Sequence, residues 1–215
     1  MIRLAHALAL IALSFTAPQR AIAADEAGDF DYYVLALSWN AAWCEAEGAG
    51  RGAPQCDPAR DIGFTLHGLW PQHERGWPEF CRTGQRDPSR SETRAMADIM
   101  GSGGLAWHQW KKHGRCSGLS PEAYFALARD AWEMIVRPDV LRRVTTPLRV
   151  PPRVIEQAFI EANQGLRANG VTVTCKDRRF REVRICLTKG LVPRPCSGAV
   201  AKDCPIENPV FAPMR

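Results

Sequence analysis

The sequence lacks several features that would place it in other classes of protein. It has no internal repeat and no low-complexity tract, and beyond residue 24 no apolar run approaches the ~20 residues that a membrane-spanning helix needs. It also has no C-x2-C pair, a spacing typical of zinc sites. These absences, together with the length of the chain, favour a single globular domain over residues 24–215.

The sequence also lacks a large excess of positive or negative charge. The 28 Lys and Arg residues exceed the 23 Asp and Glu residues by 5, and two of the basic residues, Arg3 and Arg20, lie in the N-terminal 23 residues. Residues 24–215 therefore carry a formal charge of +3, which is 26 minus 23. This mildly basic balance suits a polyanionic partner that is bound and released, but it equally suits an ordinary solvated surface.

The N-terminal 23 residues have the layout of a secretory signal peptide. Arg3 precedes the apolar run from Leu4 to Phe15, and small residues at 21–23 provide a cleavage site, although Ala24 also allows a cut one residue later. A membrane anchor is the alternative, but the apolar run is too short to span a bilayer. We therefore expect an exported protein, periplasmic or extracellular, with no membrane attachment after cleavage.

All eight cysteines follow the expected signal peptide, and an even number of cysteines in an exported chain favours disulfides. They are Cys44, Cys56, Cys81, Cys116, Cys175, Cys186, Cys196 and Cys204. Zinc coordination is the competing interpretation, which the wide spacings disfavour. We expect four disulfides, but the spacing alone does not determine how the cysteines pair.

Hydrophobic periodicity indicates a mixture of strands and helices. The pattern predicts strands over 32–39 and 62–66, a Gly- and Pro-rich loop over 48–58, helices over 91–100, 121–135 and from 152 to about 170, and a β-hairpin over 171–187. Ser120 and Pro121 mark the start of the second helix as N-cap and first helical residue. Long helices among antiparallel strands predict an α+β fold.

The segment from Trp107 to Gly114 is tested as a helix, in which each residue advances ~100° around the axis. Four polar residues then share one face: His108, Lys112, Gln109 and His113 fall at about 0°, 40°, 100° and 140°. Trp107 and Trp110 fall on the opposite side, so we expect both in the core. The two histidines are spaced i, i+5 rather than the i, i+4 of H-E-x-x-H, which disfavours a zinc site.

Two imidazoles and a lysine suit the cleavage of RNA without a metal. The reaction needs a base for the ribose 2′-OH proton, an acid for the 5′-oxygen leaving group and a cation beside the phosphorane. Histidine titrates near neutral pH, so one imidazole can be neutral while another is charged. His113 and Lys112 supply two of these groups, and His67, which we expect at the end of the strand over 62–66, supplies the third. We interpret His73, in a polar segment, as a structural or surface residue.

Two motifs of the sequence resemble those of the ribonuclease T2 family. The first, FTLHGLWP at 64–71, is similar to the family pattern F-T-x-H-G-L-W-P. The second, HQWKKHGRC at 108–116, is similar to H-E-W-x-K-H-G-x-C. Both occur in the family's order, in an exported, cysteine-rich chain, which makes the resemblance specific.

The resemblance implies an α+β fold with a central antiparallel sheet flanked by helices. It also implies the disulfides Cys44–Cys56, Cys81–Cys116, Cys175–Cys204 and Cys186–Cys196, of which the second would hold the two catalytic segments together. The implied product is a 2′,3′-cyclic phosphate from single-stranded RNA, cleaved with broad base preference. We expect a monomer that needs no metal and no cofactor.

The resemblance also assigns roles to individual residues. His113 and His67 are expected to be base and acid, Lys112 the stabiliser of transition-state charge, and His108 a phosphate-binding residue. Trp70 is expected to stack on a base, with a core tryptophan as the alternative. We also expect Lys111 to bind the substrate.

Gln109 is the fifth residue that we expect to be catalytic, and it departs from the family pattern, which has Glu after the first histidine of the second motif. An amide can still donate and accept hydrogen bonds, but it removes a negative charge. Ser38 stands where many members have Gln, and Gln72 follows the first motif, so the base preference is not predicted. The alternatives are a weak or inactive RNA-binding or toxin-like member of the family, and a structural secreted domain with no affinity for RNA.

Overall fold

A computed structural model describes residues 25–214 of the chain. The predicted signal peptide over 1–23 lies outside these residues. None of the described helices combines the length and the apolar character that crossing a membrane requires.

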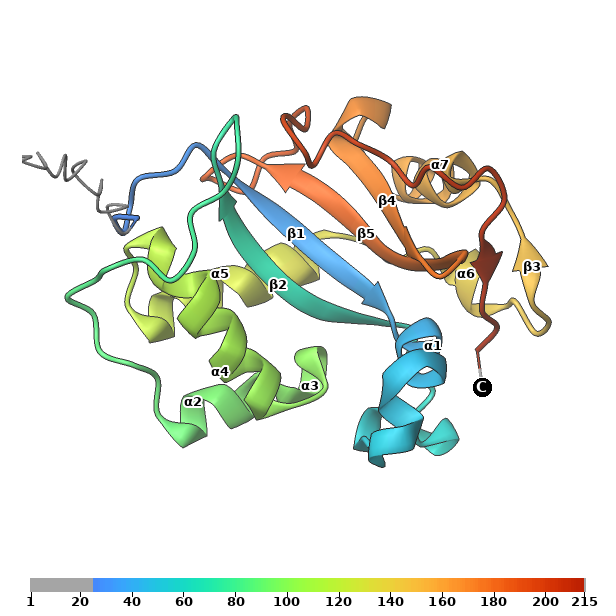
Figure 1. Cartoon of the computed structure of the whole chain (residues 1–215), viewed down its shortest axis with the longest axis horizontal. Coiled ribbons are helices and arrows are strands. Elements are labelled where there is room, and N and C mark those ends of the chain that lie inside the picture. The colour runs from blue at the N-terminus through green and yellow to red at the C-terminus, as the bar shows by residue number, and fades with distance from the viewer. Residues whose placement is uncertain (1–24, 215) are drawn as a thin grey trace, which may run out of the picture.

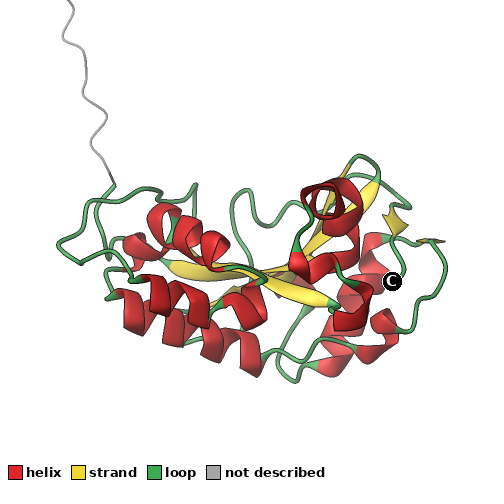
Figure 2. Cartoon of the chain, turned by 90° about the horizontal axis from the view of Figure 1, so that it is seen from below, coloured by secondary structure: helices red, strands yellow, loops and turns green. Residues whose placement is uncertain are grey.

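Helices surround a curved sheet (Figures 1 and 2). The strands are β1 (Tyr32–Trp39), β2 (Phe64–Gln72), β3 (Leu148–Arg149), β4 (Val171–Lys176), β5 (Arg179–Leu187) and β6 (Val210–Phe211). The α-helices are α1 (Asn40–Trp43), α2 (Arg90–Ala95), α3 (Ala97–Met100), α4 (Gly103–Lys112), α5 (Pro121–Met134), α6 (Asp139–Arg142) and α7 (Pro152–Ala162). Short helical turns occupy Cys44–Gly48, Ala49–Arg51, Pro54–Cys56, Pro58–Arg60, Gly114–Ser117 and Ala168–Gly170.

The sheet is built around β1, which pairs antiparallel with β2 on one side and with β5 on the other. The strand order is β2-β1-β5-β6-β3, and β4 pairs antiparallel with β5 as the predicted hairpin. The short contact between β5 and β6 is parallel. This arrangement confirms the predicted α+β fold with flanking helices.

The alternating side chains of β1 belong to two apolar clusters. Tyr33, Leu35 and Leu37 lie in the main core, together with residues of α5 and α7. Tyr32 and Val34 lie in a smaller cluster, against which Trp70 packs. Because successive side chains of a strand point to opposite faces, one face of the sheet carries the main core and the other is left for the site.

Two predicted helices end or break earlier than the apolar pattern indicates. The helix predicted over 91–100 is divided into α2 and α3 at Met96. The helix that follows Pro152 ends at Ala162, not near Gly170. Asn163, the next residue, has an extended backbone, and its side-chain amide donates to the Phe159 carbonyl at 2.8 Å. This bond satisfies a carbonyl that the helix leaves without a partner at its end.

Two further predictions change in detail. The second strand runs from Phe64 to Gln72, longer than the predicted 62–66, so the whole first motif is strand and His67 lies inside it rather than at its end. The predicted loop over 48–58 consists largely of short helical turns.

All eight cysteines form disulfides, in the pairs that the resemblance implies: Cys44–Cys56, Cys81–Cys116, Cys175–Cys204 and Cys186–Cys196. With no free cysteine left, thiolate coordination of zinc is excluded. The second bridge joins the turn after α4 to the loop that follows β2, rather than to β2 itself. It therefore fixes the loop at one side of the site.

A pair of carboxyl groups links α7 to the C-terminal segment and makes stability depend on pH. Burial, together with Asp203, raises the pKa of Glu156 to about 8. A carboxyl group whose pKa is raised by folding destabilises the native state as pH rises from its unfolded pKa to its folded one. We therefore expect Glu156→Gln to raise Tm at pH 8 and to leave it unchanged at pH 4.

The size of this effect is expected to be a few degrees, because about 1 kcal/mol corresponds to ~2–4 °C in a protein of this size. Calorimetry at both pH values measures it. Glu161→Gln, on an exposed position of the same helix, serves as the control that removes a charge without removing this pair. Equal Tm changes for the two variants at pH 8 would contradict the assignment.

Candidate active site

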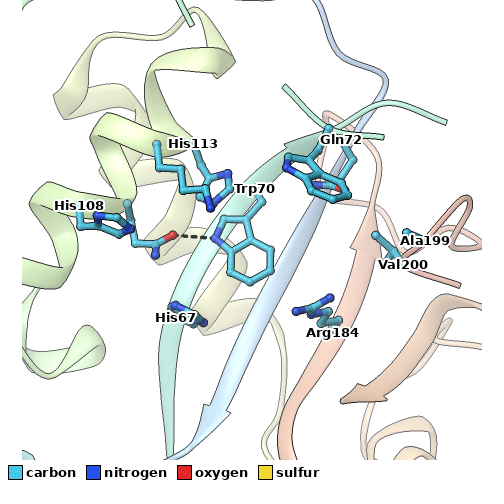
Figure 3. Close-up of a pocket in the computed structure, with 11 residues that line it drawn as sticks. His67, Trp70, Gln72, His108, His113, Arg184, Ala199 and Val200 are labelled. Atoms are coloured by element: carbon cyan, nitrogen blue, oxygen red, sulfur yellow. Dashed lines mark hydrogen bonds between the residues drawn. The ribbon is translucent and has the colours of Figure 1, made fainter. Parts of the chain in front are cut away.

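A cavity of about 290 Å³ lies between the C-terminal half of α4, the strands β2 and β5, and the loop after β2 (Figure 3). Its lining residues are His67, Trp70, Gln72, Trp77, His108, Gln109, Lys112, His113, Arg184, Ala199 and Val200. All five residues predicted to be catalytic, and Trp70, are among them. The fold therefore brings the two motifs together at one cavity.

His67 occupies a β-bulge in β2. Ala36 pairs with Gly68 and the next residue of β1, Leu37, pairs with Leu66, so His67 has no partner on β1. An extra residue of this kind bends the strand and redirects its side chain. The bulge turns the half-exposed imidazole of His67 toward the cavity.

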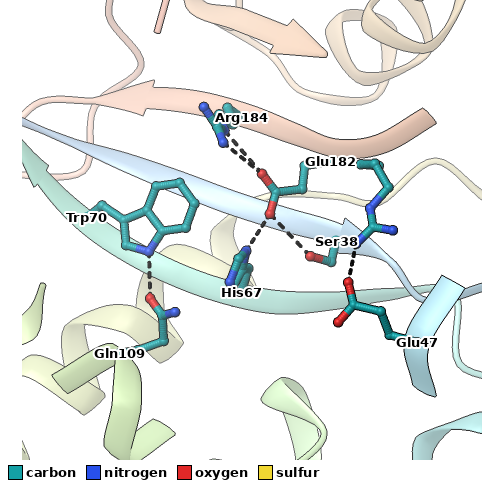
Figure 4. A network of polar contacts seen from close by, with 8 residues as sticks. Ser38, Glu47, His67, Trp70, Gln109, Glu182 and Arg184 are labelled. Atoms are coloured by element: carbon teal, nitrogen blue, oxygen red, sulfur yellow. Dashed lines mark hydrogen bonds and ion pairs between the residues drawn. The ribbon is translucent and has the colours of Figure 1, made fainter. Parts of the chain in front are cut away.

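A buried carboxylate holds the other side of this imidazole (Figure 4). Nδ1 of His67 forms a very short contact with Oε1 of Glu182, a residue of β5 that is 8% exposed. Arg184 donates to the second oxygen of Glu182 from Nε at 3.2 Å and from Nη2 at 3.1 Å. Burial on its own raises the pKa of Glu182, but the bond with His67 and the charges of His67 and Arg184 outweigh it and lower the pKa to about 2.

Helix α4 carries the second motif, and its polar face differs in part from the prediction. The helix begins at the N-cap Ser102, whose hydroxyl accepts from the Leu105 amide at 3.1 Å. His108 is exposed, whereas Gln109 is 3% exposed. Trp110 is fully buried as predicted, but Trp107 is 42% exposed, so its placement in the core was wrong. At ~260° the side chain of Trp107 lies 60° around the axis from that of Trp110, and this angle places it outside the buried face of the helix.

His113, the residue after α4, is almost completely buried at the back of the cavity. Burial, with smaller contributions from Lys112, His67 and His108, lowers its pKa to about 3. Its Nδ1 is buried and has no hydrogen-bond partner among the described residues. Nε2 is therefore the nitrogen through which a neutral His113 would meet a ligand.

Trp70 lies between the two histidines. Its ring is 5.1 Å from that of His67, in an edge arrangement, and 5.2 Å from that of His113. Its indole N–H donates to Oε1 of Gln109 at 2.7 Å. An indole N–H can only donate, so the amide oxygen of Gln109 must face it, and the amide nitrogen is left as a donor for another group.

The two lysines of the motif have different surroundings. Lys112 lines the cavity and lies 3.4 Å from the carboxylate of Glu79. Lys111 is not a lining residue, and its ammonium is 3.0 Å from Asp87. Lys111 is therefore not part of this cavity, because the two side chains leave the helix ~100° apart, and its role in substrate binding stays a prediction.

The sequence does not predict the site residues Glu182, Arg184 and Trp77, nor the cavity residues Ala199 and Val200. Glu182 and Arg184 follow from the pattern of β5, since Val183, Ile185 and Leu187 face the main core and the alternate residues must face the site. Trp77 is 50% exposed in a loop and has no such pattern. It presents a large open ring to the cavity.

A second cavity, of about 400 Å³, lies on the other side of His67. Trp43, Arg181 and Ser38 contribute to its walls, as does Glu182. His67 therefore stands between two hollows of the same face. Within residues 25–214, no group of three or more His, Cys, Asp and Glu side chains is arranged to hold a metal ion.

Comparison with known proteins identifies relatives of this chain. The model of the Ribonuclease T2 family matches residues 30–196. A ribonuclease of Aeromonas hydrophila is 36% identical over 179 residues, which cover 76% of this chain and 74% of the relative. Ribonuclease I of Escherichia coli strain K12 is 32% identical over 165 residues, covering 57% of this chain and 61% of the relative.

A solved structure shares the fold. It is a variant of RNase MC1 in complex with 5′-UMP, with a TM-score of 0.60 and 21% sequence identity, covering 75% of this chain and 89% of that one. At this level of identity the likeness establishes the fold alone.

Proposed function

Since the chain belongs to the ribonuclease T2 family, we propose that it is an endoribonuclease that cleaves single-stranded RNA without a metal through a 2′,3′-cyclic phosphate. The observation that carries the proposal is the meeting of His67, His113 and Lys112 at one cavity. The 5′-UMP bound to the related RNase MC1 variant supports a nucleotide ligand. The names of the two relatives, both called ribonucleases, support RNA cleavage as the activity.

His113 is the base in this proposal and His67 the acid. With its pKa lowered to about 3, His113 is neutral at mildly acidic pH and can accept the 2′-OH proton. The 2′-oxygen then attacks phosphorus to form the cyclic phosphate, and the 5′-oxygen leaves with a proton from His67. The anionic Glu182 beside His67 suits a group that must carry a proton.

Lys112 and His108 are assigned to the phosphate. Both line the cavity, on the same side of α4, and a fixed cation there stabilises the charge of the phosphorane. The donor nitrogen of Gln109 is a further group that can reach a phosphate oxygen. Trp70 and the more exposed Trp77 offer rings for a base, and stacking on a ring tolerates different bases, which agrees with a broad preference.

The test is incubation of the oxidised protein with RNA from pH 4 to 8 in excess chelator, with analysis of the product ends. Cyclic 2′,3′-phosphate ends are expected. Binding without cleavage would point to the inactive RNA-binding alternative, and a strict need for divalent metal would overturn the proposal.

Export is part of the proposal. Four disulfides suit an oxidising compartment, either the periplasm or the exterior of the cell, after removal of the signal peptide over 1–23. We propose that the mature protein, residues 24–215, acts as a monomer.

Gln109→Glu is expected to change the rate or the pH profile. The oxygen of a glutamate can still accept from Trp70, but its second oxygen replaces the donor nitrogen of Gln109 and adds negative charge beside the buried His113. A neighbouring anion favours the protonated ring, so the acid limb of the kcat/KM profile should move to higher pH. Identical profiles for the two proteins would remove residue 109 from the catalytic network.

A further inference from the structure

We propose that Glu182 is a positioning residue for the acid step, holding Nδ1 of His67 so that Nε2 faces the scissile bond, and that β5 thereby supplies the carboxylate that this chain lacks at position 109. The inference rests on the proposed function and extends it to a residue outside both motifs. Glu182 does not touch the substrate in this assignment. It acts through His67.

The first support is the geometry of the contact. Glu182 is a buried carboxylate on the strand next to β1, and its Oε1 meets Nδ1 of His67 across the sheet. An imidazole held at one nitrogen has its ring orientation and its tautomer fixed, so the other nitrogen is presented for proton transfer. The bulge at His67 supplies the backbone position for this contact, and Glu182 fixes the side chain.

The second support is that Glu182 is itself fixed. Arg184 binds its second oxygen twice, and the hydroxyl of Ser38 lies 3.4 Å from its first. The guanidinium of Arg184 also lies 5.2 Å from the centre of the Trp70 ring (Figure 4). A buried carboxylate without partners would cost the folded state much free energy, so these partners indicate a specific binding site for this anion rather than an incidental surface pair.

The third support comes from the hydrogen bonding and the neutral charge of Gln109. Its oxygen is committed to Trp70, and an amide has no charge to offer an imidazolium. Glu182 is therefore the carboxylate that contacts an imidazole in the cavity, within the described part of the chain. The negative charge lies on the His67 side of the site, and the His113 side is left neutral and buried.

The charges around His67 come from several elements. Glu182, Arg184 and Arg181 are on β5, His108, Lys112 and His113 are on or next to α4, and Glu47 is on the turn after α1. Arg181 is paired with Glu47 at 3.4 Å. Apart from Glu182, the groups that line the cavities with His67 include more cations than anions, so loss of this carboxylate leaves the ring in a net positive surrounding.

The experiment compares wild type with Glu182→Gln. The amide oxygen of glutamine can still accept from Nδ1, so the variant removes the charge and keeps a hydrogen bond. We expect kcat to fall at least tenfold with KM changed less than threefold, and the alkaline limb of the pH profile to move to lower pH. The acid limb, set by His113, is expected to stay in place.

Two further proteins complete the design. Glu161→Gln, an exposed carboxylate on α7, controls for the change in net charge and is expected to match wild type. In a His67→Ala background, Glu182→Gln is expected to cause no further loss, because residues that act through one another are not additive. Full additivity of the two losses would overturn the assignment, as would an unchanged kcat and pH profile in Glu182→Gln.

A measurement on the wild-type protein covers the case in which the variant does not fold. Nitrogen NMR of the labelled imidazoles is expected to show His67 with its proton on Nδ1 when the ring is neutral. A neutral ring with the proton on Nε2 would overturn the inference. Failure of the proposed function is distinguishable, since in that case wild type itself produces no cyclic phosphate ends.

Discussion

His113→Ala is expected to lower kcat by at least about 10²-fold on single-stranded RNA, the range that loss of a general base produces. Burial lowers the pKa of this imidazole to about 3, so the ring stays neutral at mildly acidic pH and is available as the proton acceptor. The loss should appear in kcat rather than in KM. Initial rates on a labelled oligonucleotide measure it.

The same loss is expected for His67→Ala, and the double variant should be little worse than the more damaged single one, because acid and base act as a unit. His73→Ala is the matched control. The imidazole of His73 lies 3.9 Å from the carboxylate of Asp31 and does not line the cavity. The activity of the His73→Ala variant should therefore stay within about twofold of wild type. A His113→Ala protein with wild-type kcat would contradict the assignment of the base.

Gly68→Ala is expected to lower activity by about 10²-fold and stability by ~1–3 kcal/mol. A methyl group on Gly68 would collide with the indole nitrogen of Trp70 and the amide oxygen of Gln109, in the middle of the hydrogen bond between them. Both side chains must then move. Trp70 is in ring contact with both histidines, so its displacement reaches the acid and the base together.

Kinetics and denaturant unfolding of the Gly68→Ala variant measure the two effects. Gly104→Ala is the control, since a methyl group there has only Ser102 Oγ near it, at 3.9 Å. On the exposed side of α4, alanine should leave activity unchanged and stabilise the helix by up to ~1 kcal/mol. If Gly68→Ala behaves like Gly104→Ala, the packing argument is wrong.

Helical and strand periodicity predicted much of the fold because it depends only on neighbouring residues. The strand at 32–39, the helix that begins at Pro121 and the hairpin over 171–187 are present where their apolar patterns indicate. The break at Met96 and the early end of α7 were not predicted. In both cases the apolar pattern continues past the point where the backbone leaves the helix, so the pattern alone does not mark the end.

The candidate site was predicted to the extent that it lies in the two motifs. One cavity is lined by the five residues His67, His108, Gln109, Lys112 and His113. The spacing within each motif did not predict that the two motifs meet there, and only the family resemblance did. Trp107 was misplaced because a helical wheel gives an angle and not the surroundings at that angle. Whether a side chain at 260° is buried depends on what packs there, and for Trp107 little does.

The amino-acid sequence by itself determined the motif histidines, the α+β class and the number of disulfides, because these follow from residue identity, local periodicity and an even cysteine count. Only the tertiary structure decided that His67 sits on a bulge, that Gly68 admits the Trp70–Gln109 bond, and that Glu182 reaches His67 from 115 residues away in the chain. The physical reason is that these contacts depend on the register between strands and on the packing of α4 against them. Neither is encoded within any one segment.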